Sequence, residues 1–194
     1  MKKITILTLF PEMFAGLLEN SIVKRAISKG VVEIKLVNIR DYTLDKHHRV
    51  DTPPAGGGAG LIMKCQPIID ALKANKSEHC KTLMLSPLGD TYNQKKARLL
   101  AQDTDDLILL CGHYEGIDSR VRNYVDEAVS IGDDILTGGE ILLLHSQFLL
   151  YEIFNKSHGA VYAQYRRVDA QVIGGGCTPC VVAVIVVIGG SFLI

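Results

Sequence analysis

The feature of this sequence that most restricts its fold is a set of three apolar, strand-like runs, each followed at once by a glycine-containing loop. The loops occupy residues 85–89, 111–118 and 130–140. In α/β proteins the carboxyl ends of parallel strands meet at one edge of the sheet, and glycine lets the backbone approach a ligand closely. We therefore expect the three loops to form one composite ligand pocket.

Strand-like and helix-like segments alternate through the first 140 residues. Such alternation is typical of an α/β protein with a mostly parallel sheet and helices on both faces. Asn20 or Ser21 is expected to cap the first helix, and Gly30 to end it. A long polar loop is expected at 40–60. The predicted strands are 4–9, 32–39, 82–85, 107–111 and 127–131, and the predicted helices are 21–29, 66–73, 93–101 and 117–124.

Length and composition set the class of protein. The chain has 194 residues, 47% of them apolar, which suffices for one domain with a small appendage. Its 21 basic and 21 acidic residues balance, so total charge gives no support to nucleic-acid binding. The apolar N-terminus stops at Pro11, so we interpret it as a strand rather than a signal peptide. Five scattered cysteines indicate reduced thiols, and we expect a cytoplasmic protein without a membrane anchor.

Composition changes sharply near residue 141. Residues 141–194 contain only five of the chain's 42 charged residues, whereas a solvated domain carries about a quarter. The β-branched run 181–188 is too short to cross a bilayer, which takes roughly 20 apolar residues. We interpret that run as a strand, or as an aggregation-prone segment if it stays unpaired. The sequence thus predicts a domain at 1–140 and an atypical tail at 141–194.

Two further motifs carry weak signals. The glycine run 56–60 matches neither a P-loop nor a dinucleotide fingerprint, which leaves a flexible hinge or lid and a ligand contact as alternatives. The basic stretch 45–49 that precedes it is typical of a solvated loop. Cys177 and Cys180 form a lone Cys-x-x-Cys pair, and zinc ribbons need two such pairs, so no metal site is predicted.

The second loop contains the most side chains suited to catalysis or ligand binding. His113, Tyr114 and Glu115 place a titratable base, a ring and a carboxylate at a strand end. A structural interpretation is that acidic residues of this loop cap the following helix. Asp118 fits that role, whereas Glu115, which precedes a glycine, is harder to explain as a cap.

The sequences of the three loops resemble those of the bacterial tRNA (guanine-N1)-methyltransferase family. The matching stretches are Leu-Ser-Pro-x-Gly at 85–89, Gly-x-Tyr-Glu-Gly-Ile-Asp at 112–118 and Ser-Ile-Gly-Asp-x-x-Leu-Thr-Gly-Gly-Glu at 130–140. Segments 9–14, 40–47 and 50–60 also fit the family pattern. Together these cover the first 140 residues almost continuously.

The resemblance implies a knotted, SPOUT-like fold in which a deep trefoil knot binds S-adenosylmethionine. It implies a homodimer, with tRNA crossing the subunit interface, and a transferase that modifies tRNA by methylating N1 of the guanine next to the anticodon. Glu115 is similar to the family carboxylate that binds the edge of the flipped-out guanine, and His47 and Asp51 match positions near the substrate. The positions that match the family's cofactor pocket are Leu85, Ser86, Pro87, Gly112, Tyr114, Gly116, Ile131, Gly132, Asp133, Asp134, Ile135, Leu136, Gly138 and Gly139.

The sequence also departs from the family pattern. Asp134 stands where the family usually has an aromatic residue, and the resemblance ends after Glu140. Asp169 lacks the sequence context of the family's catalytic aspartate, so it is not assigned as the base. The tail's composition favours a shifted reading frame or a fusion that replaces the family's C-terminal tRNA-binding domain. The alternative function is therefore a cofactor-binding or dimerising remnant without catalytic activity.

Overall fold

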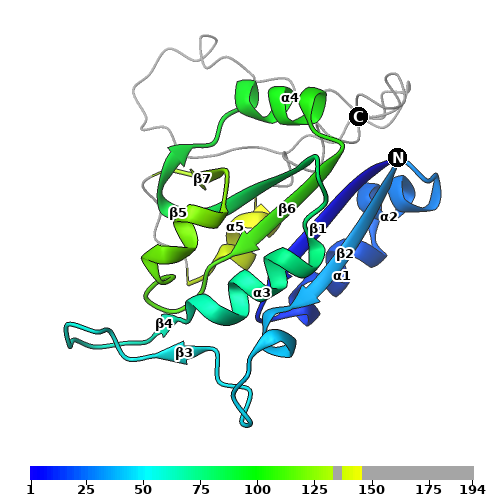
Figure 1. Cartoon of the computed structure of the whole chain (residues 1–194). Coiled ribbons are helices and arrows are strands. Elements are labelled where there is room, and N and C mark those ends of the chain that lie inside the picture. The colour runs from blue at the N-terminus through cyan, green and yellow to red at the C-terminus, as the bar shows by residue number, and fades with distance from the viewer. Residues whose placement is uncertain (133–136, 146–194) are drawn as a thin grey trace, which may run out of the picture. The chain divides into compact units, whose positions relative to one another are not determined.

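The computed structural model describes residues 1–132 and 137–145. Its centre is a five-stranded sheet in the order β2-β1-β6-β5-β7, and every neighbouring pair is parallel (Figure 1). The fold class is therefore α/β, as the alternation of segments predicts. A short antiparallel pair, β3-β4, lies outside the main sheet. The strands are β1 Lys2–Thr8, β2 Val32–Asn38, β3 Asp51–Thr52, β4 Ile62–Met63, β5 Cys80–Thr91, β6 Asp106–Cys111 and β7 Glu127–Ser130.

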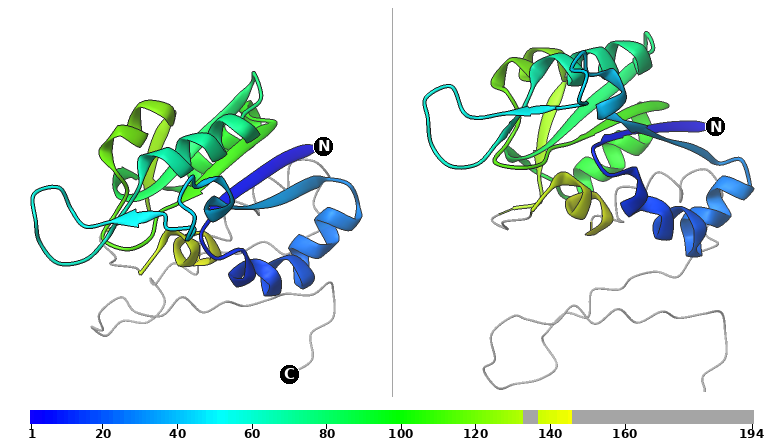
Figure 2. Two further views of the ribbon diagram at one scale, coloured as in Figure 1. Left: turned by 60° about the horizontal axis from the view of Figure 1, so that its bottom comes forward. Right: turned by 90° about the horizontal axis from the view of Figure 1, so that it is seen from below.

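Helices cover both faces of the sheet. Figure 2 shows α3 on one side, and α1, α2 and α5 on the other. The predicted helix over 117–124 is instead a 3-10 helix that begins at Ser119, because Asp118 has a non-helical backbone and caps it with its side chain. The α-helices are α1 Ala15–Glu19, α2 Ser21–Ser28, α3 Cys65–Asn75, α4 Gln94–Asp103 and α5 Gly139–His145, and the 3-10 helices are η1 Pro11–Phe14, η2 Ile39–Tyr42 and η3 Ser119–Tyr124.

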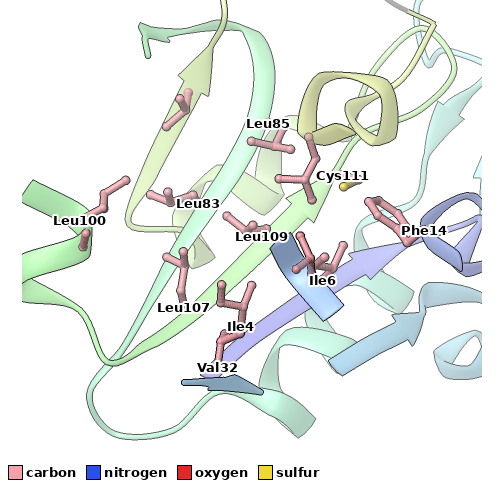
Figure 3. Close-up of a cluster of buried hydrophobic side chains, with 14 of the residues drawn as sticks. Ile4, Ile6, Phe14, Val32, Leu83, Leu85, Leu100, Leu107, Leu109 and Cys111 are labelled. Carbon is pink, nitrogen blue, oxygen red and sulfur yellow. The ribbon is translucent and has the colours of Figure 1, made fainter. Parts of the chain in front are cut away.

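Alternation along the strands creates two buried clusters. Successive side chains of a strand point to opposite faces, so Leu107 and Leu109 of β6 face one layer while Ile108 and Leu110 face the other. The first cluster joins the sheet to α2, α4 and α5 (Figure 3). The second joins it to α3, η2 and η3. Strand β6, buried throughout from Leu107 to Cys111, has the continuous apolar composition of a central parallel strand.

Helix ends follow the local signals only in part. Asn20 occupies the N-cap position of α2, but its side chain bonds back to the Gly16 carbonyl oxygen instead of capping. Gly30 follows the helix with φ of 65°, a left-handed conformation that glycine adopts without strain. The loop predicted at 40–60 contains η2 and β3, because Asp51 and Thr52 pair with β4 beyond the glycine run. None of the helices in the described residues has the length and apolar composition needed to cross a membrane.

Cysteine burial leads to a testable expectation. Cys65, Cys80 and Cys111 are free and buried. Desolvation raises the pKa of all three thiols: to about 11 at Cys80, and well above the ordinary value at Cys111. Because the thiolate is the reactive form, we expect iodoacetamide at pH 8 to alkylate Cys80 roughly 100-fold more slowly in native than in urea-unfolded protein, and Cys111 to be strongly protected as well. Peptide mapping by mass spectrometry measures each rate, and equal native and unfolded rates at Cys111 would contradict its burial.

Candidate active site

The three glycine-containing loops meet at one cavity, as the sequence predicts. The first loop is a bulge within β5, and the other two follow β6 and β7. These three strands are neighbours in the sheet, so the loops lie at the same edge. The cavity has a volume of about 370 Å³. All three loops contribute to its lining, which consists of residues 84–88, 112–119, 122, 130–131 and 137–139.

Most of the residues that match the family's cofactor pocket line this cavity. Gly132 is described but does not line it. Asp133, Asp134, Ile135 and Leu136 lie outside the described residues, as do Asp169, Cys177 and Cys180. The matching residues in the lining are Leu85, Ser86, Pro87, Gly112, Tyr114, Gly116, Ile131, Gly138 and Gly139, together with Glu115.

The third loop packs directly on the backbone of the second. The Gly139 amide donates to the carbonyl oxygen of Gly112 at 2.7 Å, and Gly138 pairs with His113 in an antiparallel bridge. A Cβ atom at Gly139 would lie only 2.9 Å from both the Cα of Cys111 and the amide nitrogen of Gly112. The start of α5 can therefore approach β6 this closely only because residue 139 has no side chain.

The first loop leaves the sheet and returns to it. β5 pairs with β7 up to Leu85 and resumes at Asp90, so the residues between them bulge outward. On the way back, Gly89 packs against the backbone of Ala128 and Val129, where a Cβ would clash. Leu88, at the outer end of the bulge, lines the cavity and is 81% exposed. Strand β5 is therefore longer than the predicted 82–85, and its irregularity shapes the cavity wall.

Beside the cavity lies a buried hydrogen-bond network that sequence reasoning missed. The Glu140 carboxylate is fully buried, and its Oε1 accepts a hydrogen bond of 2.7 Å from the Thr8 hydroxyl at the end of β1. Its Oε2 lies 3.3 Å from Nδ1 of His113. The His113 ring in turn packs against Phe10, with ring centroids 4.7 Å apart. This Thr8–Glu140–His113 network ties the first strand to the second and third loops. Glu140 stands within a recognised motif, but nothing in the sequence marks its distant partner Thr8.

Glu115 is held against the glycine run. Its amide donates to the carbonyl oxygen of Leu61 at 3.0 Å, and Gly60 packs against its side chain so tightly that a Cβ there would clash. The Met63 amide also donates to the carbonyl oxygen of Gly116, and the Asp118 amide donates to the carbonyl oxygen of Met63. The chain after the glycine run therefore lies along the second loop. Residues 56–60 themselves do not line the cavity.

The other candidates from the long loop lie beyond the cavity lining. His47 is exposed, and its amide donates to Asp45 at 2.7 Å. Asp51 pairs with Met63, which places it one strand away from the second loop. Asp118 caps η3 as predicted, accepting from the Arg120 amide at 3.0 Å, and the hydrogen bonds from Arg120 lower the pKa of its carboxyl. No cluster of metal-ligating side chains occurs in residues 1–132 and 137–145.

Comparison with known proteins identifies the family. The family model described as tRNA (Guanine-1)-methyltransferase matches residues 1–147. The chain belongs to this methyltransferase family. Its methyltransferase relatives include the tRNA (guanine-N(1)-)-methyltransferases of Carboxydothermus hydrogenoformans, 59% identical over 140 residues, and of Clostridium botulinum, 54% identical over 140 residues. That of Dictyoglomus turgidum is 51% identical over 141 residues.

The matched residues make up a larger share of this chain than of its relatives. The matched residues are 72% of this chain and 55% of the Carboxydothermus methyltransferase, and 72% and 58% for the Clostridium relative. For the Dictyoglomus relative they are 73% and 57%. The chain thus spans a little more than half the length of the curated methyltransferases that it matches. All three loops of the cavity fall within residues 1–147, the range that the family model matches.

Proposed function

We propose that this chain contains the S-adenosylmethionine-binding core of a tRNA methyltransferase that modifies N1 of the guanine next to the anticodon. The observation that carries the proposal is the meeting of three family-matching loops around one cavity. A volume of about 370 Å³ is within the range of small-molecule sites, roughly 300–1,000 Å³. The relatives are named tRNA (guanine-N(1)-)-methyltransferases, and residues 1–147, which the family model matches, include the whole cavity lining.

The residues of the cavity fit S-adenosylmethionine. Leu85, Pro87 and Ile131 offer an apolar surface for an adenine ring. Gly138 and Gly139 lack the side chains that would clash with the second loop, so the third loop packs closely on it and both loops line the cavity. When bound, S-adenosylmethionine would supply a methyl group on a positively charged sulfur, ready for displacement by a nucleophilic nitrogen.

The protein's own contribution is to position the nucleophile. Methyl transfer is an in-line displacement, so the guanine N1 must be held in near-attack geometry while its proton leaves to a base. We assign Glu115 to the edge of the flipped-out guanine, because it is exposed at the cavity and its backbone is fixed by Leu61. On this proposal, His47 and Asp51 contact the part of the substrate that lies outside the cavity.

The finer features of the family complete the proposal. We propose that the described loops form part of a trefoil knot, since the third loop packs on the backbone of the second. We also propose a homodimer, which would cover the exposed side chains of Met13 on η1 and Ile141 on α5. Its tRNA partner would cross the subunit interface, and the enzyme would act in the cytoplasm, where that substrate is found.

Binding of S-adenosylmethionine tests the proposal by isothermal titration calorimetry. Gly112→Val is expected to weaken binding at least tenfold, because the glycine lines the cavity and a Cβ would already lie 3.1 Å from Ile117 Cδ1. The matched control Gly56→Val is expected to change affinity less than twofold, since nothing lies within 4 Å of a Cβ there. Failure of the folded wild-type chain to bind S-adenosylmethionine would refute the proposed function.

Transfer of a labelled methyl group separates catalysis from binding. The substrate is a tRNA transcript with guanine next to the anticodon, and the control transcript has adenine there. Methylation of the first transcript alone supports the proposed enzyme. Binding of S-adenosylmethionine without transfer to either transcript would favour the alternative, a cofactor-binding remnant.

A further inference from the structure

Arg40 is fixed at the rim of the cavity. It lies in η2, where its amide donates to Asn38 Oδ1 at 3.0 Å and its carbonyl oxygen is 3.4 Å from Nδ1 of His48. Its guanidinium reaches across to the second loop and donates to the Tyr114 hydroxyl at 3.3 Å. Both the backbone and the side chain of Arg40 are thus held in place before any ligand binds.

Tyr114, whose hydroxyl accepts this hydrogen bond, has an unusual backbone conformation. Its φ is 59°, a left-handed value that is uncommon for a residue with a side chain. Its ring meets His113 edge to face, with centroids 5.0 Å apart, and it remains 36% exposed. A left-handed aromatic residue at a candidate site is the kind of strain that packing and function together maintain. Here it directs the phenolic oxygen toward Arg40.

The charge of Arg40 is not neutralised in the described part of the chain. There, no carboxylate forms an ion pair with its guanidinium, and its one side-chain hydrogen bond is to a neutral phenol. Arg49 in the adjacent loop differs, because Asp45 accepts from its Nε at 3.2 Å and its Nη2 at 3.0 Å. Guanidinium has five donors, so Arg40 retains most of its capacity for an anion.

The position of Arg40 indicates which kind of anion it would bind. Arg40 does not line the cavity; it lies beyond Tyr114, which does. A small molecule enclosed by the three loops would therefore end before it, whereas a polyanion that continues out of the cavity would pass it. A planar guanidinium binds phosphate through two parallel hydrogen bonds.

We propose that Arg40, held by Tyr114, is the anchor for a backbone phosphate of the RNA substrate beside the base that enters the cavity. This inference rests on the proposed function, since it takes RNA as the substrate. Phosphate contacts fix the register of a nucleic acid on a protein without reading its sequence. Arg40 is thus a positioning residue that sets which nucleotide of the strand faces Glu115.

RNA binding by single-site variants tests this assignment. The probe is a fluorescein-labelled anticodon stem-loop RNA, titrated with the full chain at several salt concentrations in the presence of S-adenosylhomocysteine. We expect Arg40→Gln to weaken binding about tenfold and to reduce the slope of log K against log salt by about one, the contribution of one phosphate contact. Arg40→Lys keeps the charge but loses the bidentate geometry, so it should recover the salt slope and only part of the affinity.

The matched control is Arg49→Gln, which removes the same charge from a residue already paired with Asp45. It is expected to change RNA affinity less than twofold. If both Arg40→Gln and Arg49→Gln lost the same RNA affinity, the phosphate anchor would be overturned, because the loss would then reflect diffuse charge attraction. A calorimetric loss of S-adenosylmethionine affinity in Arg40→Gln, with RNA affinity intact, would instead assign Arg40 to that ligand's carboxylate.

The wild-type chain distinguishes failure of the anchor from failure of the proposed function. Binding of S-adenosylmethionine without measurable binding of the stem-loop RNA would overturn the phosphate anchor and leave the methyl-donor pocket intact. Binding of neither would refute both. Circular dichroism of each variant establishes that any loss arises in a folded chain.

Discussion

Replacing Gly139 by alanine is expected to lower the free energy of unfolding by about 3 kcal/mol, the upper end of the usual cost of overpacking. The new methyl group would lie 2.9 Å from the Cα of Cys111 and from the amide nitrogen of Gly112. Both are backbone atoms of the central strand end, so no side-chain rotation can relieve the contact. The start of α5 must move away, and the 2.7 Å hydrogen bond between Gly139 and Gly112 is then lost.

Thermal and urea denaturation of Gly139→Ala measure this effect, with Gly16→Ala as the matched control. Gly16 lies inside α1, and nothing is within 4 Å of a Cβ built on it. Because alanine is the better helix former, the control should be neutral or slightly stabilising. Similar stability of both variants would contradict the close approach of the third loop to the second. The S-adenosylmethionine titration should show a matching loss for Gly139→Ala alone.

Replacing Glu140 by alanine is expected to lower the free energy of unfolding by about 3 kcal/mol, because it removes a fully buried carboxylate and leaves both of its hydrogen-bond partners without it. The Thr8 hydroxyl loses its 2.7 Å acceptor, and Nδ1 of His113 loses the oxygen 3.3 Å away. A cavity also opens between β1 and α5. Glu140→Gln retains the shape and an oxygen for Thr8, so we expect it to cost only about 1 kcal/mol.

Urea denaturation gives the free energies, and Glu33→Ala is the matched control. Glu33 lies on the edge strand β2 with its side chain exposed, so its removal should change stability by less than about 0.5 kcal/mol. Equal costs for Glu140→Ala and Glu33→Ala would show that the Thr8–Glu140–His113 network contributes nothing to stability. A Glu140→Gln variant as unstable as Glu140→Ala would show that the charge of the carboxylate matters more than its shape.

Local patterns predicted most of the regular elements, because period-two and helical patterns of apolar residues reflect burial on one or two faces. The predicted strand 107–111 and helix 93–101 each agree with the structure to within two residues. The predictions were wrong where long-range pairing decides the outcome. β5 continues to Thr91 because residues beyond its bulge rejoin β7, and β3 exists because it pairs with β4 across the glycine run.

The candidate site was predictable to a similar degree. The three loops could be grouped because strand ends of a parallel sheet share one edge, and glycines there leave room for a ligand. Their mutual contacts could not be predicted. The pairing of Gly138 with His113, the packing of Gly60 on Glu115 and the reach of Arg40 to Tyr114 join residues 25 to 74 positions apart along the chain.

The sequence by itself therefore determined the α/β class, the loops that line the cavity, and the resemblance to the methyltransferase family. The tertiary structure alone decided the strand order, which places β1 in the interior of the sheet beside β6. That order brings Thr8 to Glu140, 132 residues away, and the folded loop 40–60 brings Arg40 to Tyr114. The reason is physical: local patterns report which side of an element is buried, but only packing specifies what lies against it.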